Sequence, residues 1–181
     1  MTLNIDRPLL ILDLDETLIF ATDQPVETPC DFTAGPYHVY KRPFVEQFLG
    51  TVQPVFDIAI WSSSTADYVA TIVRAMLPAE ITLTFHWSRL RCTDRYHPER
   101  QESYWVKDLK KVKRLGYDLC RVLVVDDSPE KLERNYGNAV YVKPFEGNPT
   151  DQELQRLGPY LVGLAGHPDF RAVEKRGWRS T

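Results

Sequence analysis

Three short apolar runs, each ending abruptly in polar residues, restrict the possible folds of this chain more than any other feature of its sequence. They are rich in Leu, Ile and Val and cover residues 8–12, 55–61 and 121–125. An apolar run of this length with no polar face predicts a strand that is buried on both sides, which is typical of parallel sheets. The sequence therefore predicts a central parallel sheet.

Stretches with helical spacing of apolar residues separate or follow these runs, over residues 43–52, 65–77, 104–115 and 151–164. Shorter strands are predicted over residues 37–40, 81–85 and 139–142. This alternation predicts a three-layer α/β sandwich with right-handed crossovers. Segments 21–35 and 86–103 interrupt it, and we interpret them as loops or small hairpins at the mouth of a site. We expect the polar tail, 166–181, to be loosely held.

The composition of the 181 residues fits one globular domain, since 43% of them are hydrophobic and 26% are charged. A formal net charge of −3 argues against a general nucleic-acid binder that acts through a basic surface. The first ten residues lack the pattern of a secretory signal, and no apolar run approaches the roughly 20 residues that span a bilayer. Three cysteines without C-x-x-C spacing indicate neither a disulfide framework nor a zinc site. We therefore expect a soluble cytoplasmic protein.

Two carboxylates, Asp13 and Asp15, follow the first apolar run directly. Side chains two residues apart on an extended chain share a face, so both point to the carboxyl end of a strand, where ligands bind in open α/β sheets. Two such charges about 4 Å apart repel by about 4 kcal/mol at an effective dielectric near 20, which favours a bound cation or a retained proton. A strand end followed by an Asp or Thr turn is the alternative interpretation.

A second acidic pair, Asp126 and Asp127, follows the third apolar run. If the two strands are neighbours, four carboxylates converge at one edge of the sheet and require a hard divalent cation with oxygen ligands. Mg²⁺ fits best, because it is commonly held by one or two carboxylates and keeps positions open for water and phosphate oxygens. The pair is also typical of a helix cap with Pro129 in the first turn.

Hydroxyl and ammonium groups complete the candidate site. Ser62, Ser63 and Ser64 follow the second apolar run, and hydroxyl and N–H groups at a helix start suit a phosphoryl oxygen. We expect Ser62, with Ser63 beside it, to contact the substrate and Ser64 to cap the helix. Lys107 is the candidate cation, because it begins the predicted helix that leads into the third run, although a lysine in such a place is more often solvated.

Four segments in this order, LLILDLDETLIF, IAIWSSS, YWVKDL and RVLVVDDSPEKL, resemble the motifs of the haloacid dehalogenase superfamily. More narrowly, they are similar to the NLI-interacting-factor-like phosphatases, which act on the carboxy-terminal domain of RNA polymerase II. The likeness runs from about residue 8 to 162 and includes KRPFVEQFL. It implies a Rossmann-like three-layer sandwich in a single domain over 1–181, with its core at about 8–164 and a small insertion after the second motif.

The resemblance also implies the roles of individual residues. In that family the first Asp attacks phosphorus and the second serves as general acid and then base, which implies these roles for Asp13 and Asp15. The magnesium ion is held by the first Asp, by the main-chain carbonyl of the second, and by the residue that matches Asp127. Asp126 would orient Lys107 or a metal-bound water, and Lys107 would neutralise the transferring phosphoryl group.

The substrate is expected to be phosphoserine or phosphothreonine in a protein or peptide. Too few residues separate Asp15 from Ser62 for a large cap domain, which encloses small metabolites in other branches of the superfamily. Ser62 matches the hydroxyl residue of the family, and Thr17 would hold the turn of the first motif and lie at the substrate.

The sequence indicates less clearly which residues select the substrate. Arg91, with Arg95 and Arg100, is a candidate for contacting a second phosphate or an acidic peptide, although surface arginines commonly do neither. Phe20 or Trp61 would line an apolar pocket, or would be core aromatics.

Two other functions stay open at this point. A small-molecule or nucleotide-end phosphatase would use the same catalytic residues. A binding module without chemistry, as in an import-receptor subunit of the mitochondrial inner membrane, need not keep the acidic motifs and usually carries a membrane anchor. We favour a monomer that does not enter the membrane, cytoplasmic or, in a eukaryote, nuclear.

Overall fold

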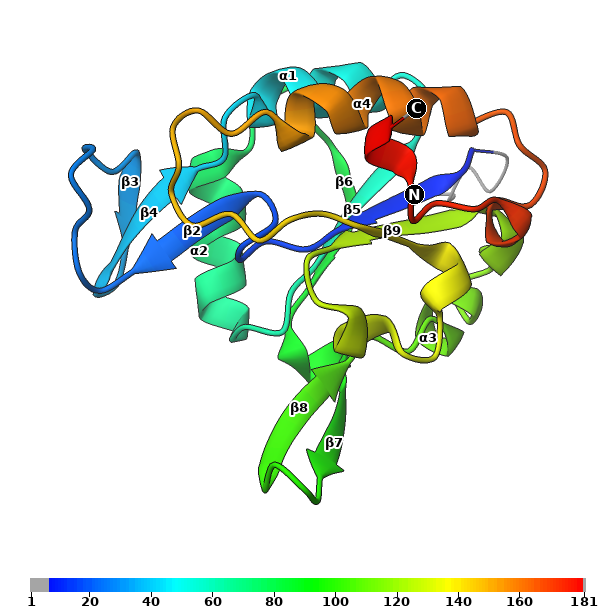
Figure 1. The fold of residues 1–181 in the computed structure, drawn as a ribbon, viewed down its shortest axis with the longest axis horizontal. Helices are drawn as coiled ribbons and strands as arrows, with labels where there is room; N and C mark the ends of the chain where they lie inside the picture. Colours follow the sequence, from blue (N-terminus) through cyan, green and yellow to red (C-terminus); the bar gives the residue numbers. More distant parts are fainter. Residues whose placement is uncertain (1–6, 181) are drawn as a thin grey trace.

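A five-stranded parallel sheet forms the centre of the computed structural model, which describes residues 7–180. Its strands are β1 (Leu9–Leu12), β5 (Asp57–Trp61), β6 (Leu83–Trp87), β9 (Val122–Asp126) and β10 (Ala139–Tyr141). They lie in the order β10-β9-β1-β5-β6 (Figure 1). The three apolar runs are therefore the neighbouring strands β9, β1 and β5, and the predicted parallel sheet is confirmed.

The two faces of the sheet are covered by different helices. Leu10 and Leu12 of β1 pack in one core with buried side chains of α1 (Val45–Val52), α2 (Ala66–Met76) and α4 (Glu153–Leu164). Leu9 and Ile11 face a second core, which includes Val112 of α3 (Lys110–Lys113). Because successive side chains of a strand point to opposite faces, a strand between two cores must be apolar throughout. The three-layer sandwich is confirmed, and Figure 1 shows α1 and α4 side by side above the sheet.

Two additions extend from the central sheet. The first is an antiparallel sheet of β2 (Ile19–Thr22), β3 (Phe32–Ala34) and β4 (Tyr37–Lys41), in the order β2-β4-β3. The second is a hairpin of β7 (Thr93–His97) and β8 (Glu102–Val106), which projects away from the core (Figure 1). The expectation of loops or small hairpins over 21–35 and 86–103 is therefore confirmed.

The helix predicted over residues 104–115 is wrong in its first half. Tyr104, Trp105 and Val106 belong to β8, and only Lys110–Lys113 is α-helical. Aromatic and β-branched side chains favour strands, and β8 pairs with β7 from Thr93 opposite Val106 to His97 opposite Glu102. Pairing with the preceding strand of the hairpin therefore outweighed the local helical spacing.

Short 3₁₀ turns occupy several connections, at Arg89–Arg91, Leu119–Arg121, Pro129–Leu132, Tyr136–Asn138, Phe170–Ala172 and Trp178–Ser180. Phe170 and Trp178, in the tail that we expected to be loosely held, are buried in the core that contains α4. Among residues 7–180, no helix combines the length and the apolar character needed to cross a bilayer. The expectation about a secretory signal concerns residues 1–10, of which the first six lie outside the described part of the chain.

A fully buried arginine fixes the turn that follows β1. Arg42 donates one hydrogen bond to the carbonyl of Thr17 at 3.0 Å and two to the carboxylate of Asp151, each at 2.9 Å. Thr17 belongs to the acidic motif after β1, and Asp151 lies just before α4. Arg42 therefore ties this turn to the start of the closing helix.

Arg42→Met should lower the free energy of unfolding by about 3 kcal/mol, because it leaves the Asp151 carboxylate and the Thr17 carbonyl without their donor. Urea unfolding measures this loss. The matched control is Lys41→Met, which breaks the more exposed Lys41–Glu46 ion pair and should cost less than about 1 kcal/mol. Equal losses in the two variants would contradict the proposed importance of Arg42.

Candidate active site

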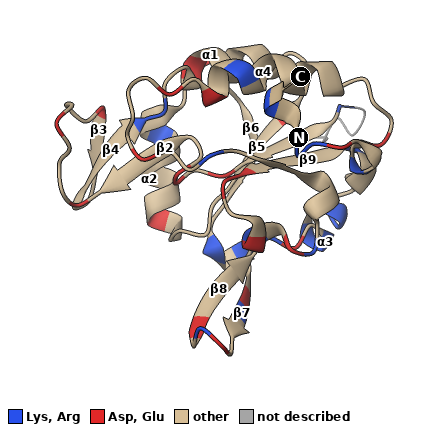
Figure 2. Cartoon of the chain, in the orientation of Figure 1, with Lys and Arg blue, Asp and Glu red and all other residues tan. Residues whose placement is uncertain are grey.

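Two carboxylates are brought together by the register of β1 and β9. Asp13 follows Leu12, the last residue of β1, and its backbone N–H donates to the carbonyl of Val125 at 3.0 Å. Asp126 is the last residue of β9, and both acids are buried. Figure 2 shows acidic positions gathered in the middle of the molecule, near the ends of the central strands. The predicted convergence at this edge of the sheet is therefore present.

The ammonium group of Lys107 lies between these two acids. Its Nζ atom is 2.9 Å from Asp13 Oδ1 and 2.5 Å from Asp126 Oδ2, and its side chain is 0% exposed. Lys107 directly follows β8, and its backbone N–H donates to the carbonyl of Lys131 at 2.8 Å. The predicted cation thus reaches the site from the end of the hairpin rather than from a helix.

A second lysine, which the sequence reasoning missed, contacts the same acids. Lys131 Nζ lies 2.8 Å from Asp13 Oδ2, 3.5 Å from Asp126 Oδ1 and 3.5 Å from Asp127 Oδ1. It is placed by the 3₁₀ turn Pro129–Leu132, which folds the chain back after β9. The spacing of four residues between Asp127 and Lys131 is the sequence signal that could have revealed it.

The two lysines keep Asp13 ionised. Burial raises the pKa of Asp13, but the ammonium groups of Lys107 and Lys131 outweigh this effect and lower the pKa to about 2. Burial lowers the pKa of Lys131, but the charges of Asp13 and Asp126 raise it above its usual value. Burial and the charge of Asp13 raise the pKa of Asp126 to about 6. Asp13 is therefore available as an unprotonated nucleophile.

Asp15 faces a different set of partners. Tyr68 Oη donates to Asp15 Oδ1 at 2.6 Å, and Ser64 Oγ donates to Asp15 Oδ2 at 2.9 Å. Burial raises the pKa of Asp15, against the opposing effect of the hydrogen bond from Tyr68. A carboxyl group with a raised pKa can hold a proton and release it, as a general acid and base must.

The expected capping of α2 by Ser64 is wrong, while a substrate contact by Ser62 stays a prediction. Thr65, not Ser64, is the residue at the N-cap of α2, and its side chain caps nothing. Ser64 donates to Asp15 instead, while Ser62 Oγ accepts from the Ser64 N–H at 3.0 Å and lies 3.4 Å from Asp15 Oδ2. Ser62 thus shapes the turn, and the helix begins one residue later than capping by Ser64 requires. The carbonyl of Ser63, which is half-buried, accepts a hydrogen bond from an arginine side chain.

The donor atoms in the acidic cluster suit a hard divalent cation. Carboxylate oxygens of Asp13, Asp126 and Asp127 lie within 4.8 Å of one another. Asp13 Oδ1 is buried and accepts no well-aligned hydrogen bond, although the Lys107 ammonium lies close to it. Thr17 Oγ1 donates to Asp127 Oδ1 at 3.3 Å, which ties the first acidic motif to the second. An all-oxygen set of this kind fits Mg²⁺.

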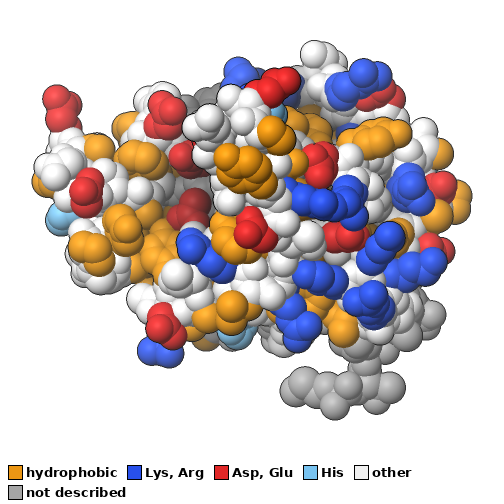
Figure 3. Space-filling model, turned by 90° about the horizontal axis from the view of Figure 1, so that it is seen from below, with side chains coloured by type: hydrophobic (Ala, Val, Ile, Leu, Met, Phe, Trp, Pro, Cys, Tyr) orange, Lys and Arg blue, Asp and Glu red, His pale blue; other side chains and the backbone are white. Residues whose placement is uncertain are grey.

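A cavity of about 290 Å³ opens beside Asp15 and is lined by Asp15, Ala21, Tyr37, Ser64, Thr65, Tyr68 and Arg89. Figure 3 shows a hollow on this side of the molecule with an acidic side chain at its bottom. Larger cavities, of about 380 and 440 Å³, lie against the C-terminal segment and contain none of the clustered acids. Of these cavities in the described part of the chain, the one beside Asp15 borders the candidate site.

Arg89, rather than Arg91, lines this cavity. Arg89 Nε donates to the carbonyl of Ser63 at 3.0 Å, whereas the Arg91 guanidinium lies over the ring of Trp87, 5.2 Å from its centre. Trp61 is fully buried in the core and packs edge-on against Trp87. A substrate contact by Arg91 stays a prediction.

The family to which the chain belongs follows from comparison with known proteins. The family model described as NLI interacting factor-like phosphatase matches residues 8–171. The CTD nuclear envelope phosphatase 1 homolog of Drosophila melanogaster is 30% identical, over 95% of this chain and 73% of that protein. The carboxy-terminal domain RNA polymerase II polypeptide A small phosphatase 1 of Homo sapiens is 32% identical, over 93% of this chain and 63% of that protein.

A solved structure of Fcp1, an essential RNA polymerase II CTD phosphatase, has a similar fold. The TM-score is 0.58 at 20% identity, over 96% of this chain and 47% of that chain. The chain spans only 28% and 53% of the length of two Dictyostelium discoideum relatives, a CTD small phosphatase-like protein 2 and a probable C-terminal domain small phosphatase. With its haloacid dehalogenase fold and a match over most of its length, the chain belongs to the NLI interacting factor-like phosphatase family.

Proposed function

We propose that this chain hydrolyses phosphomonoesters through a phosphorylated Asp13, and that its substrate is phosphoserine or phosphothreonine of a protein. The observation that carries the proposal is the contrast between two neighbouring carboxyl groups. Asp13 is held ionised by two ammonium groups, whereas the pKa of Asp15 is raised by burial. A nucleophile needs a low pKa and a general acid a raised one, and the two pKa values are shifted in these directions.

In the first step, a carboxylate oxygen of Asp13 attacks phosphorus and the bond from phosphorus to the leaving oxygen breaks. Asp15 gives its proton to that oxygen, which leaves as the serine or threonine hydroxyl. In the second step, Asp15 takes a proton from water as the water oxygen attacks phosphorus, which frees Asp13 and releases inorganic phosphate. Lys107 neutralises charge on the phosphoryl group and positions Asp13, while Tyr68 and Ser64 orient Asp15.

Asp13 and Asp127, with the main-chain carbonyl of Asp15, would hold the magnesium ion, and Asp126 would orient Lys107 through their contact at 2.5 Å. When bound, Mg²⁺ supplies positive charge for the phosphoryl oxygens. The protein adds a buried, rigid set of ligands, because Thr17 and Ser128 both donate to Asp127.

A protein substrate is supported by the open cavity beside Asp15 and by the names of the relatives. Within the described residues 7–180, the segment between Asp15 and Ser62 forms the small β2-β4-β3 sheet, α1 and β5, and contains no large cap. The exposed Arg89 at the cavity wall is suited to an acidic or phosphorylated peptide. The proposal includes a single domain over residues 1–181 and a monomer in the cytoplasm.

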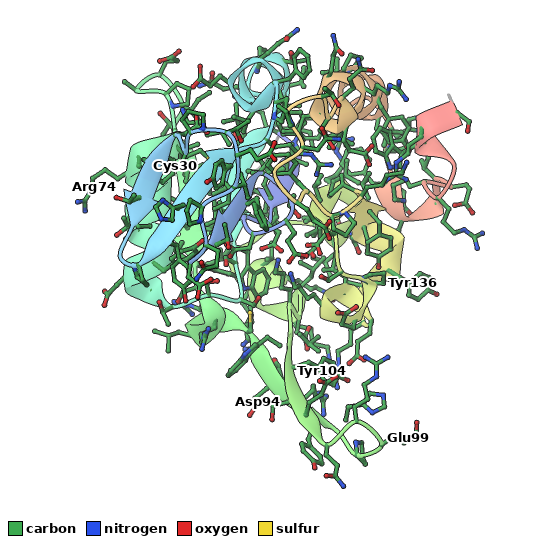
Figure 4. The ribbon with its side chains drawn as sticks, turned by 60° about the vertical axis from the view of Figure 1, so that its left-hand side comes forward. Cys30, Arg74, Asp94, Glu99, Tyr104 and Tyr136 are labelled. Carbon is green, nitrogen blue, oxygen red and sulfur yellow. The ribbon has the colours of Figure 1, made fainter. Side chains whose placement is uncertain are left out.

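Asp13→Asn should lower kcat for an aryl phosphate in Mg²⁺ by about 10³-fold or more, because the amide cannot act as the nucleophile. Removal of the metal with a chelator should abolish wild-type turnover, and added Mg²⁺ should restore it. Asp94→Asn on the projecting hairpin, where Figure 4 labels Asp94, is the matched control and should keep full activity. Undiminished activity of Asp13→Asn would refute the mechanism.

Tyr68→Phe should move the descending, alkaline limb of the pH profile of kcat/KM to higher pH. The hydrogen bond from Tyr68 stabilises the charged form of Asp15 and lowers its pKa, so its loss raises that pKa and keeps the general acid protonated to higher pH. Tyr136→Phe, at an exposed site that Figure 4 labels, is the control. A limb that stays in place, or moves to lower pH, would contradict the role of Asp15 as the acid.

Phosphopeptides should have higher kcat/KM values than sugar phosphates and nucleotides in a substrate panel, because the uncapped cavity leaves a small substrate with few contacts. Preference for a sugar phosphate or nucleotide would favour a small-molecule phosphatase on the same scaffold. Binding of a phosphopeptide without turnover, in the presence of Mg²⁺, would favour a binding module.

A further inference from the structure

Lys131 has no step of its own in the reaction proposed above, beyond the charge that it places beside Asp13, yet its ammonium group contacts every acid of the cation cluster. It lies 2.8 Å from an oxygen of Asp13 and 3.5 Å from oxygens of Asp126 and Asp127. These are the same three carboxylates whose oxygens lie within 4.8 Å of one another. The ammonium group and a divalent cation would therefore bind the same carboxylates.

The two cations cannot share these oxygens. Mg²⁺ binds oxygen at about 2.0–2.1 Å, so an ion held by these carboxylates would approach the Lys131 ammonium closely, without room for water to screen their repulsion. Either the lysine withdraws or the ion is bound weakly. Withdrawal also removes the ionic partner of Asp13 Oδ2, which the ion must replace.

Of the two lysines at the site, Lys131 is the one that can withdraw. Its side chain is 18% exposed, whereas that of Lys107 is fully enclosed. Lys131 lies on the short turn Pro129–Leu132 rather than within the sheet, and a lysine side chain has a long, flexible stem. On metal binding, Lys107 would stay between Asp13 and Asp126 and the Lys131 ammonium would move towards solvent.

We propose that Lys131 is an internal competitor for the metal ion: its ammonium group pairs with Asp13, Asp126 and Asp127 and lowers the affinity of this cluster for Mg²⁺. The inference rests on the proposed magnesium site and adds a residue that sets how much metal the enzyme needs. It predicts that metal binding and the Lys131 ion pairs exclude each other.

Isothermal titration of the full chain with Mg²⁺ tests the competition without using activity. Lys131→Met keeps the length of the side chain and removes the charge, and it should bind Mg²⁺ at least about tenfold more tightly than the wild type. Lys110→Met, on the exposed side of α3, removes the same net charge elsewhere and should change the dissociation constant less than about twofold.

Thermal unfolding is a second measurement of Mg²⁺ binding, and it also shows whether a variant folds poorly. In a chelator, Lys131→Met should melt below the wild type, because Asp13 and Asp126 lose a cation, and Mg²⁺ should raise its melting temperature more than that of the wild type. Lys131→Gln, which keeps a hydrogen-bonding end, replaces it if the Met variant does not fold.

Three results would overturn the inference. Equal or weaker Mg²⁺ affinity in the neutral variants would show that Lys131 does not compete, and would leave the proposed phosphatase intact. An equal gain in Mg²⁺ affinity in Lys110→Met would show that the effect comes from general surface charge. Absence of Mg²⁺ binding in both wild type and variants would remove the metal site as well, and with it the cofactor of the proposed function.

Discussion

The buried contact of Lys107 with Asp13 and Asp126 is the interaction on which the rest of the site depends. The register of β1 and β9 forces these two acids together, and a pair of buried carboxylates is unstable without a positive charge beside it. That charge comes from the end of β8, so the hairpin inserted after β6 must return the chain to the sheet edge at this point. The position of the projecting hairpin therefore determines the charge balance of the site.

Two carboxyl groups only two residues apart acquire opposite properties from their surroundings. Asp13 lies between ammonium groups, which lower its pKa, whereas burial raises the pKa of Asp15, which accepts hydrogen bonds from two hydroxyl groups. The turn that follows Asp15 is held in place by Arg42, which ties Thr17 to Asp151. The lysines beside Asp13 and the burial of Asp15 thus shift the pKa values of the two carboxyl groups in opposite directions.

The sequence predicted the strands that carry the site because an apolar run such as Val122–Val125 has no polar face to expose, whatever its neighbours are. It also predicted the convergence of Asp13 with Asp126, since parallel strands end at a common edge. It failed where a partner outside the segment itself decided the outcome. Trp105 is in a strand because β7 pairs with it, Ser64 faces Asp15 instead of capping α2, and Lys131 folds back onto acids supplied by two strands. The spacing of Asp127 and Lys131 indicates one of these contacts, but no pattern within a single segment indicates the others.

The central claim is that Asp13 becomes phosphorylated while Asp15 serves as the acid. Borohydride reduction during turnover of an aryl phosphate converts an aspartyl phosphate to homoserine, and peptide mass spectrometry locates the changed residue. The account predicts homoserine at position 13 in the wild type and at no position in a protein not exposed to substrate. Homoserine at position 15, 126 or 127, or steady turnover with unmodified Asp13, would contradict it.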